Sequence, residues 1–381
     1  MAYDFQKVYT LVAQTPMIHF QHGQTGATLR ATEVKPKLDR YLYKHISEYA
    51  KKFDIASKKL SDNADALNYK IRLERDGEYK TFDLDGRRQF SIYYGNQGKR
   101  EDEKIKAIMG NVKMTITCFD AELREYIDSV IDKFFIVTNF GTMQNKGFGS
   151  FLVKEKRTDI RRIPLILKQE YDAESCYSFA GDRDMNTTFT RIKMIYSLIK
   201  TGINFSGMGK GYHRSLLFEF MHYECGKNGY GNEKAWMKQT GLAPAVGRQS
   251  DQHDDVNFYV RALLGIGDHF DFMNRPGAPN DKTTVSYQCV DGSIERFSSP
   301  IFFKVINGTV YYVGKQIDKA IYGKEFLFKS TNGRSGKLRV PTEAELGDYF
   351  IEDFLEDCRK ELNDHVLKTF QELKFLTIQK N

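Results

Sequence analysis

The sequence predicts an α+β protein of two domains, and three observations carry this prediction. The 381 residues are too many for one small module and fit two domains of ordinary size. Hydrophobic residues make up 41% of the chain and charged residues 28%, which is typical of folded globular proteins. Segments with the apolar period of a strand alternate with segments that have the period of a helix.

The first half shows this alternation clearly. It begins with an extended apolar segment over residues 8–20, broken at Thr15-Pro16, and a helix with one apolar face is predicted from Ala31. A second helix is predicted to begin after Asp120 as its N-cap and to end near Gly141, before a last short strand. The strands expected between the two helices cover 67–73, 90–94 and 112–119, with turns at Asp76-Gly77 and Asp85-Gly86. This is the order of a ferredoxin-like, split β-α-β domain, the scaffold of RNA-recognition modules.

The second half is compatible with a second domain of the same kind. A helix is predicted over 186–200 and a shorter helix from Val256 to Gly265. Strands over 301–306 and 309–313 flank Asn307-Gly308, which is a strong hairpin signal, and residues 342–373 have a helical apolar stripe. We place the domain boundary near Pro164, so that the predicted domains are 1–164 and 165–381, joined by a basic connector over 154–162.

The segment Gln144 to Ser150 is the most informative stretch of the chain. It places two glycines, a lysine, two amides and a hydroxyl around one aromatic ring, between a predicted helix and a predicted strand. Glycine permits positive φ and the close approach of another polymer, while the polar side chains can bind phosphate or sugar oxygens. We interpret it as a ledge for a nucleic-acid backbone; an ordinary glycine-rich turn is the equally weighted alternative.

Charge and aromatic content agree with binding to a polyanion. The net charge is +7, and residues 1–165 carry the whole excess, with 29 Lys and Arg against 22 Asp and Glu. Tyr and Phe are frequent, at 22 and 28 residues, and aromatic faces can stack unpaired bases as well as fill a core. A generic solvated surface explains the charge equally well.

Several other classes of site are not supported by any complete motif. The glycines at Gly207 to Gly211 fit neither a Walker loop nor a dinucleotide fingerprint, so no cofactor is expected. His222 to Cys225 is half a zinc site without its second half, and Asp251 to Asp255 is explained as a helix N-cap region, so no metal is expected. The chain shows no export signal and no membrane segment, so we expect a cytoplasmic protein whose five cysteines are thiols.

Four segments in order resemble the RAMP superfamily of CRISPR-associated proteins. They are Thr15-Pro16-Met17-Ile18 with Leu29-Arg30-Ala31, the Gln144 to Ser150 ledge, Val260 to Gly265, and Arg296 to Lys304. The chain most resembles the subunit of the type III-B (Cmr) effector complex at the 3′ end of the guide RNA. The resemblance covers most of the chain between residues 15 and 304, and the ledge and the Arg296 segment are its most specific parts.

The resemblance implies two tandem ferredoxin-like domains that bind guide RNA (crRNA) and target RNA inside an antiviral complex with other RAMP subunits, without a catalytic centre. By position, it implies RNA contacts in three groups of residues. They are Arg30, Lys35, Lys37 and Arg40 on the first helix; Asn145, Lys146, Gly147, Phe148, Gly149 and Ser150 in the ledge; and Lys210, His213, Arg214 and Arg296 in the second domain. Residues 31–36 depart from the family's proline-rich, arginine-rich helix entry, so the first group is the least secure.

The alternative hypothesis is an enzyme. Related RAMP proteins cut RNA without metal by using a His, Tyr or Lys at the 2′-hydroxyl, and a histidine can act as acid or base near neutral pH. The candidates in this chain are His19, His22, Tyr41, Tyr43 and His45. Their spacing does not select a catalytic role, so the RNA-binding, non-catalytic interpretation is preferred.

Overall fold

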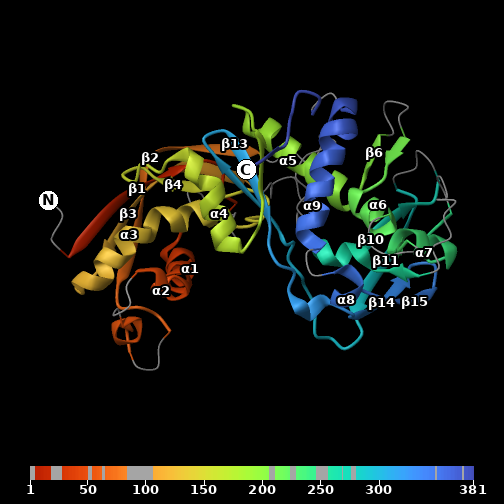
Figure 1. Ribbon diagram of the computed structural model, residues 1–381, viewed down its shortest axis with the longest axis horizontal. Helices are drawn as coiled ribbons and strands as arrows, with labels where there is room; N and C mark the ends of the chain where they lie inside the picture. Colours follow the sequence, from red (N-terminus) through yellow and green to blue (C-terminus); the bar gives the residue numbers. More distant parts are fainter. Residues whose placement is uncertain are drawn as a thin grey trace.

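The structure of the protein is a computed structural model that describes residues 5–18, 28–49, 54–61, 65–83, 106–205, 211–223, 229–245, 256–267, 269–275, 280–347, 350–370 and 373–381. Within these ranges, two four-stranded antiparallel sheets have ferredoxin-like strand order. The predicted α+β class with two tandem ferredoxin-like units is therefore confirmed. Figure 1 shows the first unit in red to yellow and the second mainly in green and blue.

The first sheet has the order β2-β3-β1-β4, and α1 and α3 lie on the same side of it (Figure 1). Asp120 caps α3 as predicted, because its side chain accepts a hydrogen bond from the Leu123 amide at 2.9 Å. The elements in chain order are β1 (Gln6–Ala13), α1 (Ala31–Lys44), α2 (Ile46–Tyr49), β2 (Lys70–Asp83), β3 (Lys106–Thr117), α3 (Ala121–Val137) and β4 (Phe151–Val153).

One predicted turn in this unit is wrong. β2 continues through Asp76-Gly77, and its pairing with β3 shifts register between Asp76 and Lys80. Gly77 has a φ of 82°, so its positive φ serves a bulge inside a long strand instead of a hairpin. The strand expected over 90–94 and the turn at Asp85-Gly86 lie outside the described residues.

The second sheet has the order β12-β13-β5-β16, which repeats the topology of the first. The predicted hairpin is confirmed, with Asn307 and Gly308 at φ values of 49° and 76° between two paired strands. The ferredoxin-like elements are β5 (Cys176–Ala180), α5 (Met185–Lys200), β12 (Ile301–Ile306), β13 (Thr309–Gly314), α9 (Phe350–Glu361) and β16 (Gln379–Lys380).

Insertions enlarge this second unit. They carry α6 (Leu216–Tyr223), α7 (Glu233–Gln239), the 3-10 helix η4 (Val260–Leu264) and a third antiparallel sheet of order β10-β11-β14-β15. The strands of that sheet are β10 (His269–Met273), β11 (Lys282–Cys289), β14 (Glu325–Ser330) and β15 (Ser335–Arg339), and α8 (Glu343–Leu346) follows them. Of the short helix expected from Val256, only Val260–Leu264 is helical, as η4, because Asn257–Phe258 forms a short strand, β9. The long C-terminal helix is divided among α8, α9 and a π-helical turn over Leu362–Val366.

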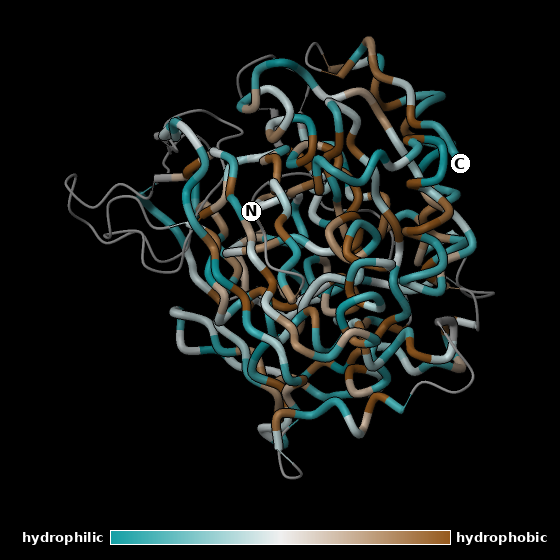
Figure 2. Tube along the Cα trace, turned by 90° about the vertical axis from the view of Figure 1, so that its left-hand side faces the viewer, coloured by the Kyte–Doolittle hydropathy of each residue, from teal (hydrophilic) through white to brown (hydrophobic). Residues whose placement is uncertain are grey.

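Strands β12 and β13 of the second sheet are buried on both faces and join the two units. Phe302 and Ile306 of β12 pack into the core of the first unit, whereas Phe303 and Val305 pack into the core of the second. Burial on both faces explains why β12 is apolar at every position except Lys304 instead of alternating between apolar and polar residues. Along much of the chain, hydrophobic and hydrophilic residues instead follow one another in short succession, as the brown and teal segments of Figure 2 show.

The segment between the two sheets is helical. β4 ends at Val153, β5 begins at Cys176, and α4 (Ile163–Tyr171) lies between them, with Pro164 in its first turn. α4 packs against α3 of the first unit and against β5 and β13 of the second. The domain boundary near Pro164 stays a prediction.

Candidate nucleic-acid interface

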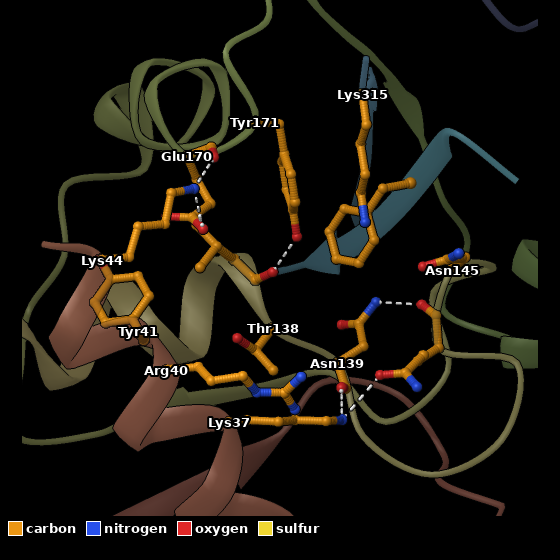
Figure 3. Close-up of a pocket in the computed structure, with 13 residues that line it drawn as sticks. Lys37, Arg40, Tyr41, Lys44, Thr138, Asn139, Asn145, Glu170, Tyr171 and Lys315 are labelled. Atoms are coloured by element: carbon orange, nitrogen blue, oxygen red, sulfur yellow. Dashed lines mark hydrogen bonds and ion pairs between the residues drawn. The ribbon is translucent and has the colours of Figure 1, made fainter. Parts of the chain in front are cut away.

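A cavity of about 360 Å³ opens at the contact between the two units. Figure 3 shows that α1, the loop after α3, α4 and the end of β13 each contribute side chains to it. Its wall combines cations, amides and aromatic rings. The lining residues are Lys37, Arg40, Tyr41, Lys44, Val137, Thr138, Asn139, Gln144, Asn145, Glu170, Tyr171, Phe302 and Lys315.

Cations outnumber acids in this cavity by four to one. Lys37, Arg40 and Lys44 come from one face of α1, because residues three, four and seven apart project in similar directions from a helix. Glu170 is the acidic residue of the lining, and it binds Lys44 at 2.9 Å. The cavity therefore carries positive charge that its own carboxylate does not balance, which favours an anionic ligand.

Arg40 is the best-placed cation for a ligand. Its side chain is exposed, and its Nε donates to the Pro36 carbonyl at 3.2 Å. Among the described residues no carboxylate forms an ion pair with its guanidinium, so the two terminal nitrogens can donate to an incoming group. A guanidinium in this state matches the oxygens of a phosphate group.

Lys37 organises the floor of the cavity. Its ammonium donates to Glu33 Oε1 at 2.9 Å. It also donates to the Asn139 carbonyl and to Gln144 Oε1, at 3.0 and 2.9 Å, and Figure 3 draws these two bonds. Burial lowers the pKa of Lys37 below its ordinary value, and Glu33 opposes that shift. Lys37 therefore holds the 139–144 loop against α1 more than it presents charge to solvent.

Lys315 comes from the other unit and reaches the same cavity. Its ammonium lies 4.4 Å from the centre of the Tyr171 ring and 4.6 Å from that of Phe302. Burial lowers the pKa of Lys315 to about 8, so its ammonium group is still mostly protonated at pH 7. Tyr171 is fixed in turn by donating its hydroxyl proton to the Val137 carbonyl.

A buried lysine supports the floor from beneath. Lys304 of β12 is fully buried, and its ammonium donates to the Phe135 and Thr138 carbonyls at 2.8 Å each and to Asn139 Oδ1 at 3.0 Å. The two carbonyls belong to the C-terminal end of α3, where helix carbonyls lack partners within the helix. Asn139 also donates to the Phe303 carbonyl at 2.9 Å, so the second unit ties down the cavity floor.

The interpretation of 147–150 as an open ledge is wrong. Phe148 and Ser150 are fully buried, the Phe148 ring stacks on Phe189 at 3.8 Å, and Ser150 donates to the Val305 carbonyl at 2.7 Å. A Cβ on Gly149 would lie 1.9 Å from the Phe140 carbonyl oxygen, at a φ of 67°. Gly149 does permit the close approach of another backbone segment, and Gly147 that of side chains, but in both cases the neighbour is the protein's own chain. Gly147, Phe148, Gly149 and Ser150 form a joint between the two units.

The other predicted RNA contacts are dispersed. Arg30 is the N-cap residue of α1. The Lys35 ammonium donates hydrogen bonds to Asp39 and to the Leu67 carbonyl, at 2.8 and 2.9 Å. His213 bonds the Arg214 carbonyl at 2.8 Å, and Arg296 is exposed on a separate segment. The structure brings Lys37, Arg40 and Asn145 together in the cavity; Lys210 lies outside the described residues.

Two cations of the cavity were missed by sequence reasoning. Lys44 could have been found, since it lies four residues after Arg40 and seven after Lys37 on a predicted helix. Lys315 gave no such signal, because only the packing of the two units brings it near α1.

Of the described residues considered for catalysis, Tyr41 and His45 are held inside the fold. The His45 side chain is 11% exposed, and its Nε2 bonds Glu170 Oε2 at 2.7 Å. Tyr41 is 7% exposed and its ring lies 4.3 Å from that of His45. Tyr43 is half-buried, whereas His19 and His22 lie outside the described residues.

The described part of the chain contains no group of three or more His, Cys, Asp or Glu side chains placed to hold a metal ion. Glu224 and Cys225 of the half zinc motif, and residues 251–255, lie outside the described residues. Cys118, Cys176, Cys289 and Cys358 are buried free thiols. None of the described helices is long and apolar enough to cross a membrane.

Comparison with known proteins gives matches along most of the chain. The family model of the Cmr1 N-terminal domain matches residues 5–203, and that of the Cmr1 C-terminal domain matches residues 212–381. No curated protein matches the sequence. Among solved structures, the chain is similar to the apo crystal structure of Cmr1 from Pyrococcus furiosus, with 9% identity over 88% of this chain and 99% of that one. The TM-score is 0.41, a level at which the likeness adds nothing about the fold.

Proposed function

Because the chain belongs to the Cmr1 family and is therefore a subunit of a type III-B CRISPR effector complex, we propose that it binds RNA there without cutting it. In this proposal, the chain contacts guide RNA and target RNA near the 3′ end of the guide, and it lies beside other RAMP subunits. The complex would act in antiviral defence in the cytoplasm. The cavity at the contact between the two units supports the proposal, since it gathers four cations around one glutamate. Base pairing between guide and target would supply the sequence recognition.

The chemistry of the cavity suits a sugar-phosphate backbone. Arg40 and Lys315 offer positive charge, while Asn145 adds an amide beside them. Phosphate contacts of this kind position RNA without reading its bases, and they make binding sensitive to salt. The burial of the His45 side chain supports the non-catalytic half of the proposal, because an RNA 2′-hydroxyl would have little access to its ring.

Fluorescence anisotropy with a labelled single-stranded RNA tests the proposal. We expect Arg40→Glu to weaken binding by about tenfold at moderate salt and to flatten the dependence of log Kd on log salt, because one phosphate contact is replaced by repulsion. Lys329→Glu is the matched control, since Lys329 is exposed on β14 and the described residues give it no ion pair. Equal affinities for the two variants would refute the cavity as the RNA site.

The same preparation tests the absence of catalysis. The protein is incubated with a CRISPR transcript in the presence of a chelator, and the RNA is examined by gel electrophoresis. Intact transcript is expected. Cleavage that His45→Ala abolishes would instead establish the metal-independent nuclease, because a histidine can act as general base at the 2′-hydroxyl.

A further inference from the structure

A second cavity, of about 240 Å³, lies where the edge strand β4 of the first sheet meets the hairpin between β12 and β13, and we refer to it as the β4 cavity. Both units contribute to its wall. The Asn307 amide at the tip of the hairpin donates to Gln14 Oε1 of the first unit at 2.9 Å, and both residues line the cavity. The β4 cavity shares no lining residue with the cavity on α1.

The β4 cavity has an aliphatic lining that reaches solvent. Leu152 is partly exposed between the buried Phe151 and Val153, so its side chain lies on the face of the sheet that α1 and α3 do not cover (Figure 1). Val12 of β1 pairs with Leu152 and is also partly exposed. Ile160, from the segment before α4, is 48% exposed. Within the described residues, this apolar surface is therefore left without a complete cover.

The charge around this surface is positive. Lys154, Lys156 and Arg157 line the cavity, and in the described part of the chain no acid does so. Lys156 is bound to Asp128 at 3.0 Å, but Lys154 and Arg157 are exposed and form no ion pair with a described residue. The acid between them in the sequence, Glu155, accepts instead from a backbone amide of β1, at 3.0 and 2.9 Å from its two oxygens. Two cations thus remain available to a partner that carries carboxylates.

RNA is a poor match for this surface. The lining contains no aromatic ring, whereas proteins that bind single-stranded RNA combine cations with aromatic faces on which bases stack. A sugar-phosphate backbone laid on aliphatic side chains would lose water without gaining polar partners. A protein segment satisfies both parts of the surface, because an apolar anchor can fill the centre while carboxylates meet the cations at the rim.

We propose that the β4 cavity docks an acidic segment of another subunit of the effector complex. An apolar side chain of that segment packs on Leu152 and Ile160, and Asp or Glu residues beside it pair with Lys154 and Arg157. The proposal does not rest on RNA binding by this chain, because membership of a complex with other subunits follows from the family.

Photo-cross-linking in the assembled complex identifies the occupant. Ile160→p-benzoylphenylalanine is introduced into the full chain, which is assembled with the other subunits and guide RNA and then irradiated. Mass spectrometry of the digested products locates the cross-link, and we expect it in one protein segment where Asp or Glu residues flank an apolar residue. Val290→p-benzoylphenylalanine is the matched control, because Val290 is 46% exposed on the second unit, outside the cavity. It should not reach that segment.

Three other results would overturn the proposal. A cross-link from position 160 to RNA would assign the cavity to the nucleic-acid interface. A cross-link to a second copy of this chain would make it a contact between identical subunits. A position 160 that gives no cross-link in the assembled complex would show that the cavity stays open there.

The strength of docking is measured by biolayer interferometry, with the full chain added to a complex assembled without it. Ile160→Asp should raise Kd about tenfold, because it places a carboxylate in the apolar contact and opposite an acidic segment. Arg157→Glu should raise Kd by a similar factor and weaken the effect of salt on the association rate. Val290→Asp and Lys329→Glu are the controls and should bind like the wild type. Wild-type affinity in both cavity variants would refute the docking site.

Two further readouts separate docking from a change in the fold and from RNA binding. Replacing the cross-linked acid of the partner by lysine should restore the binding of Arg157→Glu, which a misfolded variant could not show. The free Arg157→Glu chain should keep its affinity for single-stranded RNA, whereas Arg40→Glu should lose it. If Arg157→Glu instead loses RNA affinity and docks normally, the cavity belongs to RNA and the proposal fails. Failure of the α1 cavity as the RNA site therefore gives a different pattern from failure of this docking site.

Discussion

Replacement of Phe148 by alanine tests whether the glycine-rich segment is a joint or a ledge. The Phe148 side chain is fully buried, and its ring stacks on Phe189 with centroids 3.8 Å apart and planes 10° apart. Truncation of a buried phenylalanine leaves a cavity that its neighbours only partly fill, and it costs about 4 kcal/mol. That loss is a large part of the stability of an ordinary domain.

The size of this loss follows from the position of the ring. Phe148 comes from the first unit, but it belongs to the hydrophobic core of the second, together with Ile192 and Phe303. Its removal therefore weakens the contact between the units as well as one core. Phe148→Leu should cost less, because it keeps part of the buried volume.

Calorimetry and urea unfolding followed by circular dichroism measure the effect, with separate transitions fitted if the units unfold independently. Phe375→Ala is the control, since the Phe375 side chain is 87% exposed, and its change should stay within about 0.5 kcal/mol. RNA affinity of folded Phe148→Ala should match the wild type. If the variant instead unfolds like the control and binds RNA ten times more weakly, the segment is open to RNA and our description is wrong.

Two further predictions concern a helix cap and a titrating lysine. Asp120→Ala should destabilise the protein by about 1 kcal/mol in urea unfolding. Asp120→Asn should cost less, because asparagine can still accept a hydrogen bond from the Leu123 amide. Equal losses in the two variants would show that the ion pair between Asp120 and Lys58 dominates. For Lys315, the pKa is about 8 in the folded protein and near 10.5 when unfolded, so between these values the unfolded state binds more protons. Stability should therefore rise with pH across that window, and the rise should be smaller in Lys315→Met; identical pH profiles would contradict the assigned environment.

Local signals in the sequence predicted the local structure well. The Asp120 cap and the Asn307-Gly308 hairpin were both found, because each depends on residues within four positions of one another. The strand and helix order followed from hydrophobic period, and it led to the correct fold class. The turn at Asp76-Gly77 failed because the same glycine conformation serves a bulge.

The glycine-rich segment shows why a motif can be located correctly and interpreted wrongly. Small residues at Gly147 and Gly149 do indicate the close approach of a polymer. Nothing in the residues themselves says whether that polymer is RNA or the protein chain. Only the packing of β12 against the loop decides it, through Val305 and Phe303.

Charge could not be placed from the sequence for a related reason. Lys304 interrupts an apolar strand, which by itself suggests an outward side chain, yet it is fully buried because the end of α3 offers it three acceptors. Lys315, eleven residues later, reaches the cavity instead. The two lysines differ in role because of what the first unit places opposite each of them.

This contrast explains how the contact between the units can be both closed and functional. Where apolar side chains and backbone meet, as around Phe148, the contact excludes solvent and can only hold the units together. Where the C-terminal end of α3 meets β12, unpaired carbonyls need donors, and Lys304 and Asn139 satisfy them from below. Arg40 and Lys44 also line this cavity, and their side chains are exposed to solvent. A rigid floor under solvent-reaching cations is the arrangement that binds an anion with little loss of conformational freedom.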